Sequence, residues 1–433
     1  MSFESLKRDS DKRWLDLTTG AKPWIRISSA MCCGTSLESE EIVSEITNYI
    51  EKNKIPINID TVGCHGICYA GPIIDILYKG QPRIFWGNVT KDNVVKILDS
   101  YIKKGEVLTD NLLGSLGERS IDGIKKIDDL PGINLQNRIA LRNSGNIAFN
   151  DIFQYIANGG FEGLHKAVTK MSSDEVISEV KNSGLRGRGG AAFPTGLKWS
   201  FMSNSKGVKY ILCNCEEGDP GAYNDKGILE SDPYTLLEGM AIAGYATKST
   251  NGYVFIRHGH DGPIDRTKEA INQAYDNGLL GKNIFGSDFS FDIEVSLTGD
   301  SYVAGEETAL MESIEGKSAR PRSRPPFPAA YGVWGKPSTI NNVKSLAYVS
   351  EIIRNGSEWF KSIGTESSSG TAIVCLSGDV LNPGMYEVEM GISIKDVVEK
   401  IGGGIPDGRK LKMLQTGGPL GGVLGPDSLK VKI

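Results

Sequence analysis

The sequence predicts a multidomain protein of the α/β class, and three observations support this. At 433 residues, the chain is long enough for two to four domains and a sizeable core. Beyond residue 208, short apolar runs alternate with helical patterns, as in a sheet covered by helices. Residues 22–105 show a similar alternation on a smaller scale, and residues 366–433 show strand patterns around one helix.

The first predicted unit lies within residues 22–105, after a polar N-terminal tail at 1–21. Apolar runs predict its strands, and an amphipathic period of 3.6 residues predicts its helices. In order, we expect a strand at 25–27, a helix at 40–50, a strand at 57–60, a hairpin of 73–78 and 83–86, and a helix at 92–102. This order is typical of a thioredoxin-like fold.

The central unit is predicted at residues 171–365, after a linker and lead-in at 106–170 with a helix near 152–156. Its first helix begins at Ser172 or Ser173, and another begins at Asp232 with a proline in its first position. The remaining expected elements are strands at 209–214, 253–258 and 291–297 and a helix at 264–276.

The last unit, residues 366–433, is predicted to be a small β domain. Glu366–Gly370 is typical of a linker. Two strands beginning at 371 and 384 flank the turn at Asn382-Pro383, a helix follows at 393–401, and a return strand is expected at 410–415.

Composition excludes several classes of protein. A net charge of −5 does not indicate a binding surface for a polyanion such as nucleic acid. No apolar run approaches the ~20 residues of a membrane span. The N-terminus is polar and mixed in charge, unlike a secretory signal. We therefore expect a cytoplasmic protein, as such or at the periphery of a membrane complex. Clustering among the seven cysteines then favours metal or redox chemistry over disulfides.

Residues 184–199 combine glycines with arginine, lysine and two aromatic side chains, which predicts a nucleotide site. Glycine lets the backbone approach a ligand and offer N–H groups to phosphate, and the cations supply counter-charge. Gly187, Gly189 and Ala192 fit the dinucleotide fingerprint, but a helix rather than a strand precedes them, which argues against an ordinary Rossmann turn. A plain glycine-rich connector is the alternative.

Acidic motifs follow this segment at two later points. Glu216, Glu217 and Asp219 come directly after the predicted strand at 209–214, where open α/β sheets bind ligands. A second Gly-Glu-Glu motif stands at 305–307, at the expected start of a helix. An arginine-rich segment at 320–324 and an Asn341-Asn342 pair complete the pattern.

These four motifs, in order over residues 130–430, resemble the flavin-bearing, NADH-oxidising subunit of respiratory complex I. They also resemble its relatives in NAD-linked hydrogenases, formate dehydrogenases and electron-bifurcating complexes. The resemblance implies an NADH dehydrogenase subunit that passes electrons from NADH through FMN to iron–sulfur centres on partner subunits. The final acceptor stays open: quinone, ferredoxin, protons or formate. A scaffold that keeps the fold without NADH activity is the alternative function.

The resemblance also implies the domains and the site residues. It implies a thioredoxin-like [2Fe–2S] ferredoxin domain at 22–105, a Rossmann-like FMN/NADH domain at 171–365 and a ubiquitin-like β-grasp domain of the soluble-ligand-binding type at 366–433. The residues expected to orient the nicotinamide or ribose are Glu216, Glu217 and Glu307. The residues expected to bind FMN or NADH are Gly187, Arg188, Gly189, Gly190, Ala191, Phe193, Lys198, Phe201, Asn214, Asp219, Tyr302, Gly305, Glu306, Phe327, Asn341 and Asn342.

The chain departs from the family pattern at three positions in this region. Ala192 stands where glycine is usual, so its φ must be negative or the site must tolerate a methyl group. Cys215-Glu216 replaces Ala-Asp, and Ala304 replaces a frequent cysteine. The carboxylates favour NADH over NADPH, whereas the arginines at 320, 322 and 324 would welcome a 2′-phosphate.

The expected metal ligands are the thiols of Cys33, Cys64 and Cys68, as the family's ferredoxin domain implies. Ser28 stands where many members have a fourth cysteine, and the neighbouring Cys32 is the substitute available. A cluster-free domain that only docks a partner, and a zinc or dithiol site, remain alternatives.

Family members usually continue into a helical bundle whose cysteines hold a [4Fe–4S] cluster. The [4Fe–4S] ligands are absent from this sequence, which stops at Ile433. A fragment, a cluster on another polypeptide and a variant without this cluster are three explanations that the sequence leaves open.

Overall fold

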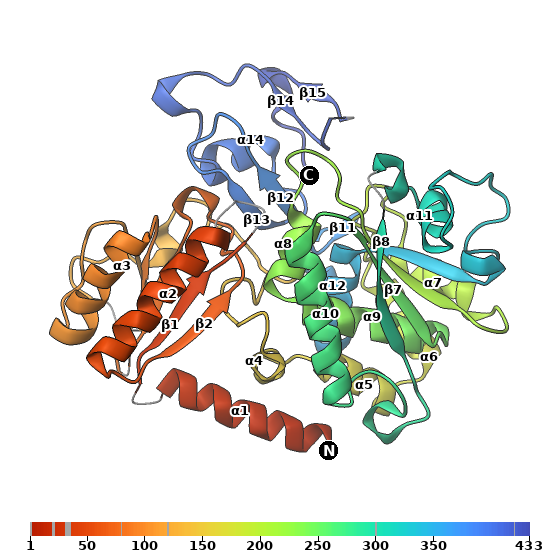
Figure 1. Cartoon of the computed structure of the whole chain (residues 1–433). Helices are drawn as coiled ribbons and strands as arrows, with labels where there is room; N and C mark the ends of the chain where they lie inside the picture. Colours follow the sequence, from red (N-terminus) through yellow and green to blue (C-terminus); the bar gives the residue numbers. More distant parts are fainter. Residues whose placement is uncertain are drawn as a thin grey trace.

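The computed structural model describes residues 2–19, 22–30, 36–78, 80–118, 121–298, 301–419 and 421–433. Figure 1 shows three lobes: an N-terminal unit around a small sheet, a larger central unit, and a C-terminal unit that lies over both. No helix among the described residues is long and apolar enough to cross a membrane. The architecture is of the α/β class that the sequence predicts.

The N-terminal unit is a five-stranded sheet in the order β2-β1-β3-β4-β5. Its strands are β1 (Trp24–Ser28), β2 (Asn58–Val62), β3 (Ile74–Leu77), β4 (Arg83–Trp86) and β5 (Leu112–Leu116). β1 pairs with β2 in parallel and with β3 in antiparallel orientation. α2 (Ser36–Asn53) and α3 (Lys91–Leu98), which continues as a π turn at Asp99–Lys104, pack together. The sheet gains β5 from the segment expected to be a lead-in.

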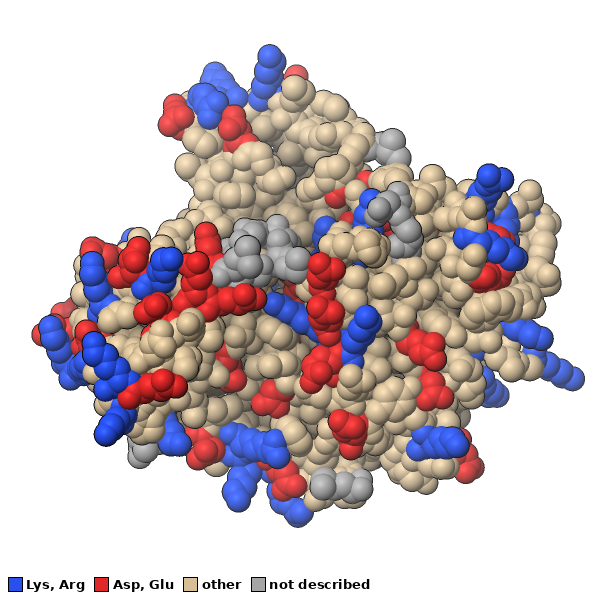
Figure 2. All heavy atoms as spheres, in the orientation of Figure 1, with Lys and Arg blue, Asp and Glu red and all other residues tan. Residues whose placement is uncertain are grey.

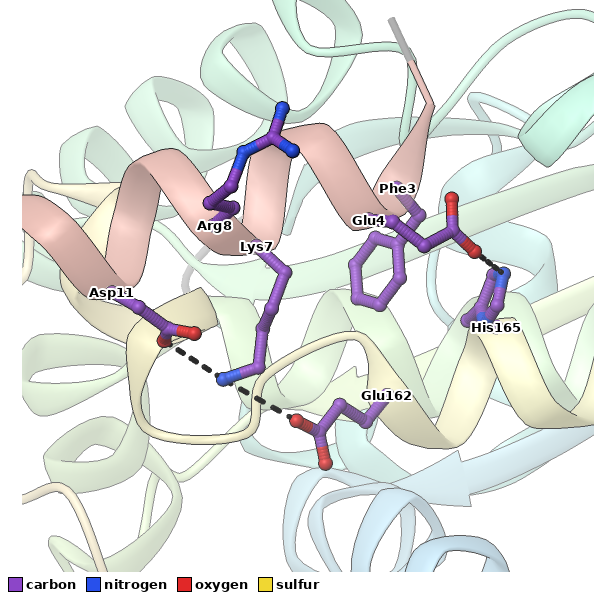
Figure 3. A pocket seen from close by; sticks show the side chains of 7 residues that line it. All are labelled: Phe3, Glu4, Lys7, Arg8, Asp11, Glu162 and His165. Carbon is purple, nitrogen blue, oxygen red and sulfur yellow. Dashed lines mark hydrogen bonds and ion pairs between the residues drawn. The ribbon is translucent and has the colours of Figure 1, made fainter.

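The N-terminal residues form a helix, α1 (Phe3–Thr19), which the polar composition did not predict. Phe3 is buried; its ring lies 4.7 Å from the imidazole of His165 and 5.2 Å from the ring of Phe285 (Figure 3). Lys7 Nζ lies between Asp11 (2.9 Å) and Glu162 (3.4 Å). A few apolar positions thus dock a largely polar helix along the lower face of the molecule (Figure 1).

The central unit is a parallel four-stranded sheet in the order β8-β7-β6-β9. Its strands are β6 (Tyr210–Cys215), β7 (Asn251–Arg257), β8 (Asp292–Thr298) and β9 (Ser338–Asn342). The chain moves outward from β6 through β7 to β8 and then returns to the other side of β6. The carboxyl ends of β6 and β9 therefore flank a switch point, where α/β sheets open a crevice for ligands.

Helices cover this sheet on both sides. They are α4 (Ile152–Ala157), α5 (Glu162–Lys170), α6 (Ser173–Asn182), α7 (Thr195–Ser203), α8 (Asn224–Ser231), α9 (Pro233–Thr247), α10 (Asp261–Asp276), α11 (Glu307–Ile314), α12 (Val343–Asn355) and α13 (Ser357–Lys361). The predicted caps are present: Ser172 forms a capping box with Glu175, and Asp232 caps α9 ahead of Pro233. α9 is buried along nearly its whole length and forms the centre of the core.

The C-terminal unit pairs β12 (Thr371–Leu376) with β13 (Gly384–Glu389) beside α14 (Ile394–Asp396), which continues as a π turn at Val397–Ile401. Two expectations here are wrong. The expected linker contains a hairpin of β10 (Gly364–Thr365) and β11 (Ser368–Ser369), because the serines pair back across the turn. The expected return strand is only β14 (Leu414–Gln415), which pairs with β15 (Val423–Leu424) across a turn of positive-φ glycines.

Buried polar contacts join the three units. The guanidinium of Arg26 pairs with Asp75 inside the N-terminal unit (2.9 Å) and donates to the carbonyl of Asn146 in the lead-in (2.5 Å). The buried carboxylate of Glu387, on β13, accepts from the backbone N–H groups of Ile139, Ala140 and Leu141. Buried polar groups need such partners, so the lead-in fixes how the outer units meet the central sheet.

Candidate functional site

A cavity of about 2460 Å³ lies at the carboxyl edge of the parallel sheet. The glycine-rich loop, the segment after β6, the start of α11 and the end of β9 line one side, and the C-terminal unit lines the other. All the residues that the sequence predicts to bind or orient FMN or NADH line this cavity except Gly190. The volume exceeds the ~300–1,000 Å³ of ordinary ligand pockets, so it leaves room for more than one ligand.

The glycine-rich loop connects α6 to α7 and turns back on itself, with the N–H of Gly187 donating to the carbonyl of Phe193 (2.9 Å). Ala192 has a φ of 51°, so of the two expected alternatives the second holds: the loop tolerates a methyl group in left-handed backbone. A Cβ on Gly189 would lie 3.2 Å from the Cβ of Asn342. Glycine at position 189 therefore lets the loop approach the end of β9 closely.

The two arginines of this loop donate to backbone carbonyls, and Arg188 also lines the cavity. Arg188 donates from Nε to the carbonyl of Thr371 (3.1 Å) and from Nη2 to that of Ser369 (2.8 Å). Arg186 donates to the carbonyl of Ser367. Both guanidinium groups hold the loop against the C-terminal unit. The carbonyls that they engage belong to a strand and a hairpin of that unit, which come close to the loop only in the folded chain.

Lys198 and Glu307 form a mixed-charge wall. The ammonium of Lys198 donates to the carbonyl of Ile340 (2.6 Å) and lies 3.5 Å from Oε2 of Glu307. Burial lowers the pKa of Lys198, and the nearby Glu307 opposes that shift. Arg324 contacts the other oxygen of Glu307 at 2.5 Å. Two cations on this wall thus flank one carboxylate.

The acidic residues after β6 have different tasks. Glu216 pairs with Arg257 at 2.5 Å, and burial raises its pKa. Glu217 is a helix cap, because its carboxylate accepts from three backbone N–H groups at the start of α8 (2.9–3.0 Å). Asp219 accepts from the hydroxyl of Tyr302 at 2.6 Å. Glu217 thus caps α8 while it also lines the cavity.

The two glutamates of the Gly-Glu-Glu motif at the start of α11 also differ in what they contact. Glu306 is the N-cap and accepts from the backbone N–H groups of Thr308 and Ala309. Glu307, the first residue of the helix, keeps its carboxylate toward Lys198 and Arg324. Only the second glutamate of this motif presents its charge without capping the helix.

Glutamate side chains pair with two arginines of the arginine-rich segment. Arg322 pairs with Glu312 and Glu315, and Arg324 lies 2.5 Å from Glu307 and 3.6 Å from Glu306. The positive charge that would attract a 2′-phosphate is therefore largely neutralised at these two positions.

Three asparagines present amides at the carboxyl ends of β6 and β9. Asn214 bridges the carbonyl of Gly305 (2.8 Å) and the N–H of Glu216 (3.0 Å). Asn342 caps α12. Asn341 accepts from the indole N–H of Trp199 (3.3 Å), but its buried Nδ2 has no protein partner among the described residues. A buried amide without an acceptor is costly, so Asn341 fits a polar ligand in the cavity.

Aromatic side chains surround the mouth of the cavity. Phe193, Phe201, Tyr302 and Phe327 are 44–61% exposed although they are large and apolar. The rings of Phe193 and Phe201 have centroids 6.3 Å apart. Exposed apolar rings gathered beside a cavity are typical of a binding surface for a flat ring system.

Comparison with known proteins identifies this region. Residues 180–351 match the model of the Nuo51 FMN-binding domain, and residues 373–424 match the SLBB domain. The chain carries a Nuo51-type FMN-binding domain.

Similar proteins are found among oxidoreductase subunits. The NADP-reducing hydrogenase subunit HndC of Solidesulfovibrio fructosivorans is 50% identical over 299 residues, which cover 69% of this chain and 61% of that protein. An NADH-quinone oxidoreductase subunit of Escherichia coli (strain K12) is 45% identical over 267 residues, which cover 61% and 60%. The chain thus spans about three fifths of the length of these relatives.

A solved NAD⁺-reducing [NiFe]-hydrogenase in the H₂-reduced state has the same fold. It matches 99% of this chain and 69% of its own with a TM-score of 0.60, at 23% sequence identity. The predicted order of domains is compatible with this likeness, which extends over nearly the whole chain.

Among the lining residues that the sequence analysis missed are four polar ones at the starts of two helices: Asn224, Asp225, Lys344 and Ser345. The first two begin α8, and the other two lie in the first turn of α12. Each directly follows a motif that was recognised, but no local signal distinguishes an inward-pointing residue of a first helical turn from a solvated one. The hydroxyl of Ser345 accepts from the N–H of Arg188 at 2.8 Å.

The predicted metal ligands lie outside this domain and are only partly described. Cys32 and Cys33 lie outside the described residues. The buried Cys64 accepts from the N–H of Gly66 at 3.2 Å, and Cys68 lies one turn further on. Ser28 is buried, and its hydroxyl accepts from the N–H of Ile73 at 2.8 Å. In the described part of the chain, no three metal-ligating side chains come together.

His65 lies in the same loop and is buried. Burial lowers its pKa to about 3, so the imidazole is neutral at physiological pH. The loop is held from the C-terminal unit, because Met385 donates its N–H to the carbonyl of Gly66 (2.9 Å). The side chains on the face shown in Figure 2 mix both charges, and acidic groups gather over α2 and α10.

Proposed function

We propose that this chain is the FMN-bearing, NADH-oxidising subunit of a multisubunit oxidoreductase. The observation that carries the proposal is one cavity that combines a glycine loop, the unpartnered amide of Asn341 and the cation–acid wall of Lys198 and Glu307. An FMN molecule needs a phosphate cradle and polar partners along its chain, and NADH needs an adjacent apolar mouth. The cavity offers both in adjoining positions.

The residues at the cradle would hold FMN. Gly187, Gly189 and Ala191 line the cavity, Asn341 has an Nδ2 without a protein partner among the described residues, and Lys198 offers positive charge. When bound, FMN would accept a hydride from NADH and release its electrons one at a time. The chain itself contributes position and field, because such a transfer depends more on ring alignment than on an acid or base.

The residues at the mouth would hold the pyridine nucleotide. Phe193, Phe201 and Phe327 offer faces for adenine, and Tyr302 lies beside them. Glu216 and Glu307 would orient the ribose or nicotinamide. Because Arg322 and Arg324 are already paired with acids, we favour NADH over NADPH as the donor.

The partners in this proposal are iron–sulfur subunits of the same complex, such as a small ferredoxin-like subunit together with a hydrogenase, formate dehydrogenase or quinone module. The N-terminal unit would add a [2Fe–2S] cluster on Cys64, Cys68 and Cys33, with Cys32 nearby. The names of the similar proteins support an oxidoreductase complex, but they give different acceptors, NADP in one and quinone in the other.

The deciding experiment is an anaerobic titration of the purified chain reconstituted with FMN. NADH should bleach the visible flavin absorbance stoichiometrically, and NADPH should do so only at much higher concentration. A flavin that binds but stays oxidised with both nucleotides would favour the scaffold alternative. A chain that binds no FMN would refute both.

A further inference from the structure

A buried lysine lies on the wall of the cavity. Lys344 Nζ donates to Oδ1 of Asp225 (2.9 Å) and to Oδ1 of Asn224 (2.6 Å). The two helices that carry these residues, α8 and α12, both begin at the carboxyl edge of the sheet. Lys344 and Asp225 are about nine-tenths buried, yet both line the cavity.

Asp225 extends the contact to a predicted flavin ligand. Its Oδ2 accepts from Nδ2 of Asn342 at 2.6 Å, and Oδ1 of Asn342 accepts from the N–H of Lys344 at 3.0 Å. Both ends of the Asn342 amide are therefore held by the protein. Asn342 in turn lies against Gly189 of the glycine loop. One set of contacts thus connects Lys344 to the cradle.

The charges of this cluster are balanced only in part. Lys344 faces the carboxylates of Asp225 and Glu217, and their proximity raises the pKa of Lys344 against the effect of its burial. Burial, followed by the charge of Asp225, raises the pKa of Glu217. Without the ammonium, two buried carboxylates would remain beside the cavity, and an anionic ligand would meet their field.

An ion pair buried at such cost is weak evidence for a role in stability, because apolar side chains would pack here as well. Its place on the cavity wall suggests a role toward the ligand instead. We propose that Lys344 is a positioning residue for FMN, which holds Asp225 and Asn342 against the glycine loop and offsets the negative field of Asp225 and Glu217. This inference rests on the proposed function of the cavity.

The test compares FMN binding by the parent chain, Lys344→Met, Lys344→Arg and a matched control, Lys209→Met. Lys209 is also buried, but its ammonium donates only to the carbonyls of Ser203 and Thr247 among its described contacts, and it does not line the cavity. FMN dissociation constants are measured from quenching of flavin fluorescence, and folding is monitored by thermal unfolding.

We expect Lys344→Met to weaken FMN binding by roughly tenfold or more, because an unpaired buried carboxylate repels the phosphate. Lys344→Arg should retain most of the affinity, and Lys209→Met should bind as the parent does even if it melts earlier. Equal FMN affinities of Lys344→Met and Lys209→Met would overturn the inference while leaving the proposed function intact. A parent chain that binds no FMN would overturn both.

A double variant keeps the test valid if Lys344→Met folds poorly. Asp225→Asn with Lys344→Met removes both charges, so it should melt closer to the parent and regain part of the lost FMN affinity. The midpoint potential of the bound flavin gives an independent readout. It should fall in Lys344→Met and stay near the parental value in Lys344→Arg and the double variant. An unchanged potential in Lys344→Met would contradict the electrostatic part of the proposal.

Discussion

Arg324 Nη1 lies 2.5 Å from Oε1 of Glu307, and Lys198 lies 3.5 Å from the other oxygen of the same carboxylate. Glu307 therefore sits between a cation on the glycine-loop side of the cavity and one from the arginine-rich segment. This arrangement keeps both cations in place at the point where the FMN and NADH positions are expected to meet.

Replacing Glu307 with glutamine should impair NADH binding more than FMN binding. The neutral amide keeps the shape but no longer orders both cations, so we expect the KM for NADH to rise roughly tenfold while the FMN dissociation constant changes less than about threefold. Steady-state kinetics and flavin fluorescence measure the two effects. Glu312→Gln on the same helix is the control, because Glu312 pairs with Arg322 and does not line the cavity. Equal losses in both constants would refute this division of roles.

Replacing Gly189 with alanine should reduce FMN retention. The new Cβ would lie 3.2 Å from the Cβ of Asn342, so the loop must move outward, at a cost of about 1–3 kcal/mol. The measurement is the flavin content after gel filtration, with the FMN dissociation constant as a second value. Gly422→Ala is the control, since its Cβ would meet nothing within 4 Å. Normal flavin content in Gly189→Ala would show that the loop does not depend on this close approach.

Replacing Cys64 with serine should remove an iron–sulfur signal. If the N-terminal unit holds a [2Fe–2S] cluster, the reduced parent gives an EPR signal that Cys64→Ser lacks, because thiolates are the expected iron ligands. Cys213→Ser is the matched control, since Cys213 is a fully buried thiol on β6 whose pKa burial raises well above its ordinary value. A silent parent would favour the cluster-free or zinc alternatives.

Replacing Asp232 with asparagine should change how stability depends on pH. Burial raises the pKa of Asp232 to about 6 from the ordinary 3.8, although Arg142 and a hydrogen bond from Asn143 oppose the shift. Between these values, the folded chain holds a proton that the unfolded chain has lost, so this group's contribution to stability falls as pH rises.

Asparagine also caps helices, so Asp232→Asn should keep α9 while losing this dependence. Relative to the parent, the variant should gain about 1–3 kcal/mol of unfolding free energy between pH 4 and 7. Denaturant unfolding of both proteins at several pH values gives the difference between their unfolding free energies. The contributions of other titrating groups are the same in both proteins and cancel in this difference. A constant difference across the range would contradict the raised pKa.

Replacing Phe3 with alanine should release α1 without unfolding the rest of the chain. Phe3 is buried between His165 and Phe285 and is, with Leu6, one of the two buried apolar side chains of a helix that is otherwise largely polar. Limited proteolysis should cut the variant within residues 3–19 faster than the parent. Leu15→Ala is the control, because Leu15 lies on the same helix and is 59% exposed. Equal cleavage of both variants would mean that Phe3 does not anchor the helix.

Much of the fold follows from patterns that are local in the sequence. The alternation around 209–297 predicts β6, β7 and β8, and the serine and aspartate before α6 and α9 predict their starts. The helix α1 was not predicted, because its few apolar residues are stabilised only by packing against α5 and Phe285. The hairpin at 364–369 was not predicted, because a serine-rich composition does not indicate which residues pair as strands.

The sequence by itself determined which segments form the FMN-binding domain, because glycines, paired acids and asparagines at the ends of strands are local signals. Only the tertiary structure decided what each side chain does there. It turned Arg188 toward the C-terminal unit, made Glu217 a cap and brought Lys344 to Asp225. The physical reason is that a hydrogen-bonding partner supplied by a distant segment leaves no trace in the residues next to the side chain it engages.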